Sequence, residues 1–385
     1  MSKETVKNFS FISFLSTFGF GFSNPIAILF FMAKGFTVFE AGLILAVMNL
    51  ACAMFEIPTG AFADSYGRRR SAIVGYLLHI VFILAIVLSN NLTLLLLASI
   101  LEGAAIAFES GAMESWAYDR LKEKKAQGLS LSMFSNSRVA VNAAMLLSAI
   151  AGGFAGSISL ALPFIFGIPV YLACIYYVFK LQEKPMRKNF LSVEKQLFIK
   201  ASNAFDHITS SRKLLSLFAS VFLLGLGLYP IFIGWQPAFK ELLGFGPAEM
   251  GFFFAAISIF AMGGNKLAER FGKSKFSLTI SLFAIAAAAF LAGFLWAPLA
   301  TLIAYLLMEL AYGASGPITS DILHKNAISD RRATIASMQG LARNLGFGVA
   351  GLLFFMLSSI PLATTWMLSS ICIFLAAFIV WKNEL

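Results

Sequence analysis

The sequence predicts an all-α polytopic membrane protein with twelve transmembrane helices in two six-helix, pseudo-symmetric halves. Three observations predict this fold. Of the 385 residues, 59% are hydrophobic and 12% are charged, which is more apolar surface than a soluble core buries. Apolar runs of about 20 residues, long enough to cross about 30 Å of hydrocarbon, recur along the chain. A polar loop and its flanking residues also occur twice in one register.

The duplicated loop follows an apolar run with an acid, a glycine and three arginines, GAFADSYGRRR at 60–70. Its second copy, AERFGKSK at 268–275, lies 205 residues further on, since 269 − 64 = 205. The same shift places Pro25 on Pro230, Ser110-Gly111 on Ser315-Gly316, Ser132-Met133 on Ser337-Met338, and Arg138 on Arg343. One ungapped shift across four hairpins predicts two homologous halves, which is the parallel repeat of a rocking secondary transporter.

The spans follow from the apolar runs in order. We expect them at 9–32, 39–62, 71–89, 93–116, 133–156 and 161–181, and then at 214–238, 247–268, 275–295, 298–320, 333–357 and 362–381. The N-terminal bundle is therefore predicted at 1–181 and the C-terminal bundle at 213–385.

Between the bundles, 182–212 is a polar cytoplasmic linker. Six apolar residues recur in it at helical spacing: Leu191, Leu197, Phe198, Ala201, Phe205 and Ile208. This pattern predicts an amphipathic interfacial helix. We interpret it as a tether packed under the bundle, in preference to a regulatory docking site.

Basic residues are distributed unevenly between the two sides of the predicted membrane. Loops after even-numbered spans contain most of the Lys and Arg, whereas loops after odd-numbered spans contain Lys34 and Lys240. By the positive-inside rule both termini lie in the cytoplasm, and we expect the chain in the inner membrane. The net charge of +10 therefore needs no nucleic-acid partner, although a basic face attracts lipid headgroups. All three cysteines lie in apolar runs, so we expect no disulfide.

The loop after span two resembles the signature loop of the major facilitator superfamily, through Gly60, Asp64, Gly67, Arg68, Arg69 and Arg70. The loop after span eight is a weaker copy, with Glu269 and Gly272 at equivalent positions. This resemblance covers essentially the whole chain and implies a transporter that works by alternating access. It also implies that these residues form a gate, in which Asp64 pairs with arginines or with a helix N-terminus of the other half. Glu56, eight residues before Asp64, is expected to belong to it.

Two further segments, EIPTG at 56–60 and SGAME at 110–114 with Tyr118-Asp119, resemble a bacterial drug-exporter-like branch of the superfamily. The antiporter branch has a glycine and proline run in span five. Here the aligned residues are Ala144, Ser148, Ala149, Gly152 and Gly153. The small side chains predict close helix packing, but the missing proline leaves antiport unassigned.

Two acids lie near the middle of predicted spans, where an ionised side chain costs on the order of 2.5–3.5 kcal/mol. Glu102 and Glu309 lie about 13 Å and 16 Å into spans four and ten, and Glu109 follows Glu102 by two turns on the same face. Spans four and ten line the central cavity in the superfamily that the chain resembles. We therefore expect Glu102 and Glu309, with no cation visible at their depth, to carry protons or bind a cationic substrate.

The charged residues of spans five and eleven have a structural interpretation. Arg138 lies at the depth of Glu109, so we favour a buried ion pair between them over a proton or substrate role for Glu109. Its repeat equivalent, Arg343, is expected to pair with Asp321 or Glu309.

Spans one and seven carry Asn24-Pro25 and Tyr229-Pro230 at equivalent positions. A proline inside a spanning helix frees a carbonyl group and bends the axis. Neighbouring side chains predict a cavity for a lipophilic or cationic ligand: Phe18, Phe20, Phe22, Phe232, Trp235 and Gln236. Because the chain has 41 Phe, contact with lipid is the alternative for any one of the phenylalanines.

Other classes of site are excluded by spacing. The GKS at 272–274 imitates the end of a phosphate loop, but Leu267 stands where a glycine is required and the preceding segment is helical. His79, His207 and His324 lie apart and form no metal-ligand spacing. No nucleophile and base pair is visible, so we expect neither an enzyme nor a cofactor.

We therefore expect a monomeric secondary transporter that exports small hydrophobic or cationic molecules, with protons, substrate and membrane lipid as its partners. One alternative is an importer or facilitator of a polar metabolite, which the direction of flux under a pH gradient would separate. The other is a non-transporting sensor or scaffold on the same fold, which would bind a ligand without flux.

Overall fold

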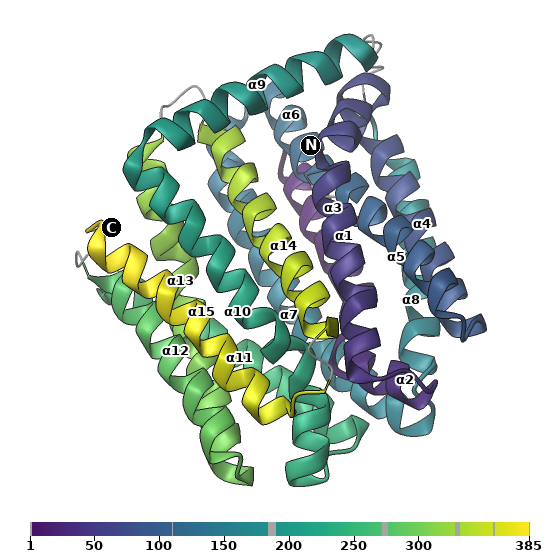
Figure 1. Ribbon diagram of the computed structural model, residues 1–385. Helices are drawn as coiled ribbons and strands as arrows, with labels where there is room; N and C mark the ends of the chain where they lie inside the picture. The colour runs from purple at the N-terminus through teal and green to yellow at the C-terminus, as the bar shows by residue number, and fades with distance from the viewer. Residues whose placement is uncertain are drawn as a thin grey trace. The chain divides into compact units, whose positions relative to one another are not determined.

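A computed structural model of the chain describes residues 2–109, 111–183, 190–271, 276–327, 332–356 and 359–384. These ranges consist of helices joined by short turns and contain no β-strand (Figure 1). The observed architecture is therefore the all-helical one that the composition predicts.

The helices of the first half have short connections. They are α1 (Ser2–Gly21), the 3-10 turn η1 (Asn24–Ile26), α2 (Ala27–Ala33), α3 (Val38–Tyr66), α4 (Arg68–Leu88), α5 (Leu92–Glu109), α6 (Ala112–Glu123), the 3-10 turn η2 (Gln127–Leu129), α7 (Ser130–Ile158) and α8 (Leu162–Lys180).

The remaining helices begin within the predicted linker. They are α9 (Phe190–Ser210), α10 (Arg212–Leu243), α11 (Pro247–Phe271), α12 (Ser277–Leu295), α13 (Pro298–Asn326), α14 (Arg332–Met356) and α15 (Leu362–Lys382). The division into bundles and linker at 182 and 212 stays a prediction, although α9 covers most of the proposed linker.

Eleven helical segments of the described residues are long and apolar enough to cross a membrane. The first runs through α1, η1 and α2, and the fourth through α5 and α6. α14 is not among them, since Gln339, Arg343 and Asn344 lower its hydropathy. Its 25 residues nevertheless extend about 37 Å, and it packs along α10. We therefore assign α14 as the twelfth span.

The two repeat-related prolines have different effects on their helices. Pro25 lies in η1, so the first span is interrupted between α1 and α2. Pro230 lies inside α10, which continues through it and through Pro237 to Leu243. The first span is therefore broken, whereas the seventh remains one helix that lacks single backbone hydrogen bonds at its prolines.

The chain divides into two compact units. Unit 1 comprises 1–30, 51–197 and 246–255, and unit 2 comprises 31–50, 198–245 and 256–385. In unit 1, α1 packs on α7 and α8, and α4 packs on α5 and α8. In unit 2, α10 packs on α14 and α15, and α12 packs on α13 and α15. These pairings are equivalent under the 205-residue shift, as expected for a duplicated bundle.

Small residues permit the closest helix contacts inside unit 1. A Cβ added to Gly152 would lie 1.9 Å from the Phe22 carbonyl oxygen, and one added to Gly251 would lie 2.6 Å from that of Ala149. α7 is therefore approached on two sides by backbone, through residues of the small-side-chain run predicted in span five. The rings of Phe154 and Phe252 meet edge to face beside this crossing.

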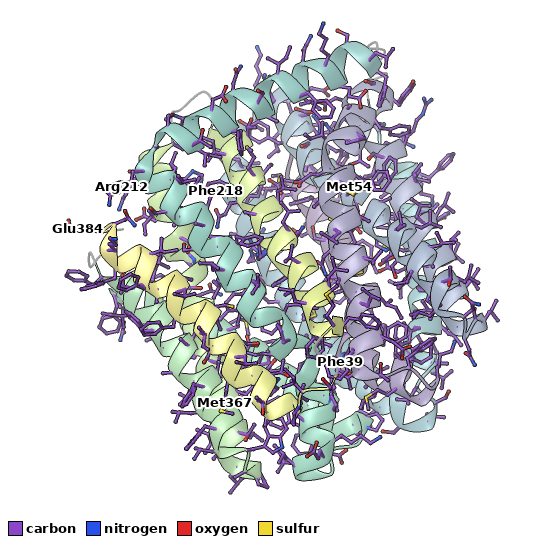
Figure 2. The ribbon with its side chains drawn as sticks, in the orientation of Figure 1. Phe39, Met54, Arg212, Phe218, Met367 and Glu384 are labelled. Atoms are coloured by element: carbon purple, nitrogen blue, oxygen red, sulfur yellow. The ribbon has the colours of Figure 1, made fainter. Side chains whose placement is uncertain are left out.

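At one end of unit 2 a hydrogen bond joins the start of α10 to the residue that follows α15. Arg212 at the start of α10 donates a hydrogen bond from Nε to Oδ1 of Asn383, at 2.8 Å. Figure 2 shows Arg212 and Glu384 near this end of unit 2, and Phe39 and Met367 nearer the other end.

Candidate functional site

A histidine and two acids meet inside unit 1, and we call His79, Glu102 and Glu109 the acid–histidine cluster. Nδ1 of His79 lies 2.9 Å from both carboxyl oxygens of Glu102, and Nε2 lies 3.2 Å from Oε2 of Glu109. The two acids reach one ring because they lie seven residues apart on the same face of α5, which packs against α4. His79 and Glu102 are 3% and 4% exposed.

Neighbouring helices fix the orientation of the cluster. The imidazole of His79 stacks on the Tyr171 ring of α8, with centroids 4.7 Å apart and planes 12° from parallel. The hydroxyl of Ser16 on α1 donates a hydrogen bond to Oε1 of Glu109. Both ring nitrogens of His79 and both oxygens of Glu109 are therefore engaged.

Glu109 also lines a polar cavity of about 300 Å³ in unit 1. α1, α4, α5, α6 and α7 contribute to its wall, and its polar lining residues are Ser13, Ser16, Tyr76, Glu109, Glu114, Ser137 and Arg138. The Glu102 side chain is 6% exposed and that of Glu109 is 24% exposed. The cluster thus extends from a deeply buried carboxyl group, through the imidazole, to a carboxyl group at the cavity wall.

The expected pairing of Glu109 with Arg138 is wrong. Glu109 binds His79 and Ser16, whereas the Arg138 side chain is exposed and lines the same cavity. At the depth of Glu102, where the sequence has no Lys or Arg, the structure places the imidazole of His79. Lys and Arg alone therefore do not account for the partners of these acids, because a histidine of the neighbouring helix contacts both.

The cluster is not repeated in the second half. The positions 205 residues after its three members are Ala284, Leu307 and Ala314, and all three line an apolar pocket of about 870 Å³ in unit 2. Of the two repeats, the first therefore has titratable side chains at these positions and the second does not.

Glu309 lies in a different setting in unit 2. It is 5% exposed, and Tyr305 lies one turn earlier on α13. The Tyr305 ring packs against Trp235 of α10 and Trp366 of α15, with centroids 6.4 and 6.0 Å apart. Gln236 is also buried on α10. Glu309, Trp235 and Gln236 therefore belong to the buried, largely aromatic interior of unit 2.

The partners expected for Arg343 are not those in the structure. Its side chain lies near Tyr312, whereas Asp321 forms an ion pair with Lys325 at 2.6 Å. Within the described part of the chain, no ion pair joins Arg343 to Glu309.

The other residues predicted for the cavity are distributed over both units. Asn24 lies in η1 of unit 1. Tyr229 of α10 donates a hydrogen bond from its hydroxyl to the Gly42 carbonyl of α3, within unit 2. Phe22 packs on Phe18 in unit 1, and Phe232 packs on Tyr312 in unit 2.

The signature loop forms an ion-pair network inside unit 1. Arg68 pairs with Asp64 at 3.0 Å and with Asp119 of α6 at 3.1 Å. Arg69 donates from Nε to the Val178 carbonyl oxygen at 3.1 Å, at the end of α8. The Asp64 partner in the structure is therefore an arginine of its own loop.

Gly67 is required by the geometry of this loop. Its φ of +110° is a conformation that residues with a Cβ rarely adopt. The Glu183 carboxylate accepts hydrogen bonds from the backbone N–H groups of Arg68 and Arg69, at 2.7 and 3.3 Å, where the helix dipole of α4 favours an anion. A Cβ on Gly67 would lie 2.9 Å from that carboxylate.

The remaining predicted gate residues contribute less to the described network. Gly60 lies in α3 against the Leu197 side chain. Glu269 is exposed near the end of α11, and Glu56 is half-buried in α3, with no ion pair to either among the described residues. Gly272 lies outside the described residues.

Comparison with known proteins shows the family of this chain. The sequence model of the Major Facilitator Superfamily matches residues 9–351. The chain belongs to the Major Facilitator Superfamily. A curated relative, the uncharacterized MFS-type transporter YxaM of Bacillus subtilis (strain 168), is 25% identical over 247 residues, which are 63% of this chain and 59% of the relative. The alignment thus spans less than two thirds of that protein.

Solved structures of superfamily fold are also similar. The nucleoside transporter NupG has a TM-score of 0.77 at 15% identity, covering 98% of both chains. A D-xylose-proton symporter has a TM-score of 0.73 at 16% identity, covering 98% of this chain and 97% of the other. At these identities the likeness shows the fold alone, and it agrees with the predicted twelve-helix, two-half architecture.

Sequence reasoning missed two residues of the site, His79 and Glu183. His79 has no metal-ligand spacing, but a histidine inside an apolar run beside two acids in the next run is itself a signal for a buried proton-binding group. Glu183 follows the end of α8 by three residues, and the signal for its role is an acid placed to reach the N-terminus of a neighbouring helix.

Proposed function

We propose that this chain is a proton-coupled secondary transporter of the inner membrane, in which the acid–histidine cluster binds the coupling proton. Its transport cycle is alternating access, and its cargo is a small hydrophobic or cationic molecule that it exports, as in the drug-exporter-like branch that the sequence resembles. The observation that supports this most strongly is His79 held between Glu102 and Glu109 inside a spanning bundle.

The charge of the cluster explains why it suits this task. Two ionised carboxylates and one imidazolium carry a net charge of −1, and one further proton makes the cluster neutral. Burying a net charge costs free energy in an apolar interior. Gain or loss of one proton therefore changes the energy of burying these helices, which is the requirement for coupling protonation to a conformational change.

The groups that contact the cluster directly are uncharged, and Glu114 and Arg138 line the same cavity as Glu109. His79 meets Tyr171 of α8, Glu109 meets Ser16 of α1, and Tyr76 of α4 lines the cavity beside Glu109. Cys174 of α8 is buried near the same acid. Proton exchange with water would therefore pass through Glu109, the more exposed acid at the polar cavity.

Cargo of lipophilic or cationic character is supported by unit 2. Glu309 supplies a buried acid, and Tyr305, Trp235 and Phe239 supply aromatic faces around it. Aromatic faces with an acid attract organic cations. In the same proposal, the loop network of Asp64 and Arg68 opens and closes one end of the transport path.

The test uses purified protein in liposomes loaded with ethidium, a lipophilic cation. Acidifying the outside drives ethidium out of wild-type liposomes, and His79→Gln and Glu102→Gln abolish this pH-driven component. Glu194→Gln, a matched change of an acid on α9, leaves it intact. Full pH-driven efflux by both cluster variants would remove the cluster from coupling.

A second candidate, uptake of a polar metabolite, is favoured by the polar cavity of unit 1. Its wall combines serine hydroxyls, acids and Arg138. These groups suit a substrate that forms hydrogen bonds better than they suit a lipophilic cation. Uptake of labelled uridine or D-xylose under the same gradient, with no ethidium efflux, would favour this alternative. If neither ethidium efflux nor uptake of the polar metabolite occurs, but a ligand stabilises the purified protein, the result would favour a sensor.

A further inference from the structure

The apolar pocket of unit 2 is a long groove between two neighbouring spans. Its volume is about 870 Å³, and α12 and α13, which pack side by side (Figure 1), form its walls, with the last turn of α11 at one end. Along α12 the lining runs from Ser277 to Leu295, which is about 27 Å at the rise of an α-helix. The groove therefore extends over most of the hydrocarbon thickness of a bilayer, about 30 Å.

Small side chains form the floor of the groove and large ones form its rims. Ala288 and Ala304 are 8% and 7% exposed, whereas Ile280, Ile303 and Leu307 are 63%, 54% and 50% exposed. Because α12 and α13 are membrane spans, these exposed apolar rims contact lipid instead of water. The groove is therefore open to the bilayer along its length.

The first repeat fills the equivalent surface with its own side chains. Under the 205-residue shift, four small lining residues of α12 replace larger residues of α4: Ser281 for Tyr76, Ala284 for His79, Ala287 for Phe82 and Ala288 for Ile83. All four larger residues of α4 are at most 8% exposed. The groove of unit 2 thus lies where the first repeat has buried side chains, and an apolar occupant would take their place in the packing.

The lining of the groove favours a hydrocarbon chain as this occupant. Among the described lining residues two are polar, Ser277 and Ser281. The Ser281 hydroxyl donates a hydrogen bond to the Ser277 carbonyl of its own helix at 2.9 Å. A polar solute would leave hydrogen bonds unmade along such a wall, whereas a hydrocarbon chain has none to lose.

The end of the groove at α11 carries a net positive charge. Lys266, Glu269 and Arg270 are exposed there, next to the lining residues Leu267 and Phe271, and two cations with one acid leave a charge of +1. Arginine and lysine bind phosphate well. Of the molecules that contact a membrane span, a phospholipid combines an apolar chain with a phosphate at one end.

We propose that the groove of α12 and α13 binds one membrane phospholipid, with an acyl chain along the alanine floor and the phosphate near Lys266 and Arg270. The acyl chain supplies the packing that Tyr76 and Phe82 supply in the first repeat. Such a lipid is held on two walls and a floor, so it leaves the protein more slowly than lipids that contact a single helix face. The site is independent of proton coupling and of the transported cargo.

The test measures which phospholipid stays on the full-length protein. Purified protein is reconstituted in dioleoyl phosphatidylcholine, extracted into detergent and weighed by native mass spectrometry. We expect one retained phospholipid on wild type and its loss from the double variant Ala284→Phe with Ala288→Phe, whose rings fill the floor. Ala151→Phe is the matched control and should retain the lipid, because Ala151 is exposed on α7, outside the groove.

Thermal unfolding in detergent gives a second reading. Added phosphatidylcholine should raise the unfolding midpoint of wild type and leave that of the double variant unchanged, since the rings already occupy the groove. Ala304→Phe enters the groove from α13 and covers the case in which the double variant does not fold.

Two results would overturn the proposal. Equal retention of phosphatidylcholine by wild type and by the folded filled variants would show that the lipid binds elsewhere. Retention of anionic phosphatidylglycerol alone, with no effect of the phenylalanines, would show that the headgroup is bound and the acyl chain is not.

Discussion

Replacing His79 by alanine removes the imidazole that both acids of the cluster contact. The Glu102 carboxyl loses its partner at 2.9 Å, and the Glu109 carboxyl loses one at 3.2 Å. A hydrogen bond to a charged group contributes about 1.5–3 kcal/mol, so two such bonds give about 3–6 kcal/mol. Glu109 is 24% exposed and keeps Ser16, which reduces the expected loss to about 3–4 kcal/mol.

The assay is thermal unfolding of the purified protein in detergent. For a bundle of this size, about 3–4 kcal/mol corresponds to a midpoint lowered by roughly 6–16 °C. His324→Ala is the control, because this histidine is exposed and surface changes stay within about 0.5 kcal/mol.

A double mutant separates loss of the ion pair from loss of packing. Glu102→Gln makes one acid neutral, so that it no longer needs a cationic partner. His79→Ala combined with Glu102→Gln should then cost less than the sum of the single changes, by about 0.5–3 kcal/mol. An unchanged midpoint for His79→Ala, or strict additivity of the two changes, would refute the inference that the cluster is a coupled buried group.

Three further predictions concern backbone contacts. Gly67→Ala should destabilise unit 1 by about 1–3 kcal/mol, because φ is +110° and the added Cβ meets Glu183; thermal unfolding measures this, and a neutral result would contradict the described loop. Tyr229→Phe should cost about 0.5–1.5 kcal/mol by removing the hydrogen bond to the Gly42 carbonyl; a midpoint equal to that of wild type would show that the bond contributes nothing. Gly251→Val should lower expression and reduce the free energy of unfolding by at least about 2 kcal/mol, since backbone of α7 occupies the space that the side chain needs. Faster hydrogen exchange at 247–255 would report the displaced helix. Unchanged exchange would count against the close crossing of the two helices.

The fold was accessible from sequence because its signals are local or strictly periodic. A run such as 71–89 is apolar over the thickness of a bilayer, and Asp64 and Glu269 keep one register across the chain. The interruption at Pro25 and the continuity at Pro230 were not accessible. A proline has the same local chemistry at both positions, and whether the helix resumes at once depends on neighbouring helices.

The site was predicted less completely for a related reason. Burial of Glu102 and Glu309 follows from their depth in apolar runs, and the structure agrees with it. The partner of Glu102 depends on the rotation of α4 about its own axis, which decides whether His79 faces α5 or lipid. That rotation is set by side-chain packing against α8, including the Tyr171 ring, and a single sequence does not specify it.

Ala284, Leu307 and Ala314 stand at the positions equivalent to the three residues of the cluster. The second repeat therefore has no copy of these titratable side chains. A gene that acquires a substitution at codon 79, 102 or 109 cannot recover through the other half, even though both halves keep the same helix pairings. Saturation mutagenesis should therefore show an uneven landscape, intolerant at these three codons and permissive toward apolar replacements at their three duplicates.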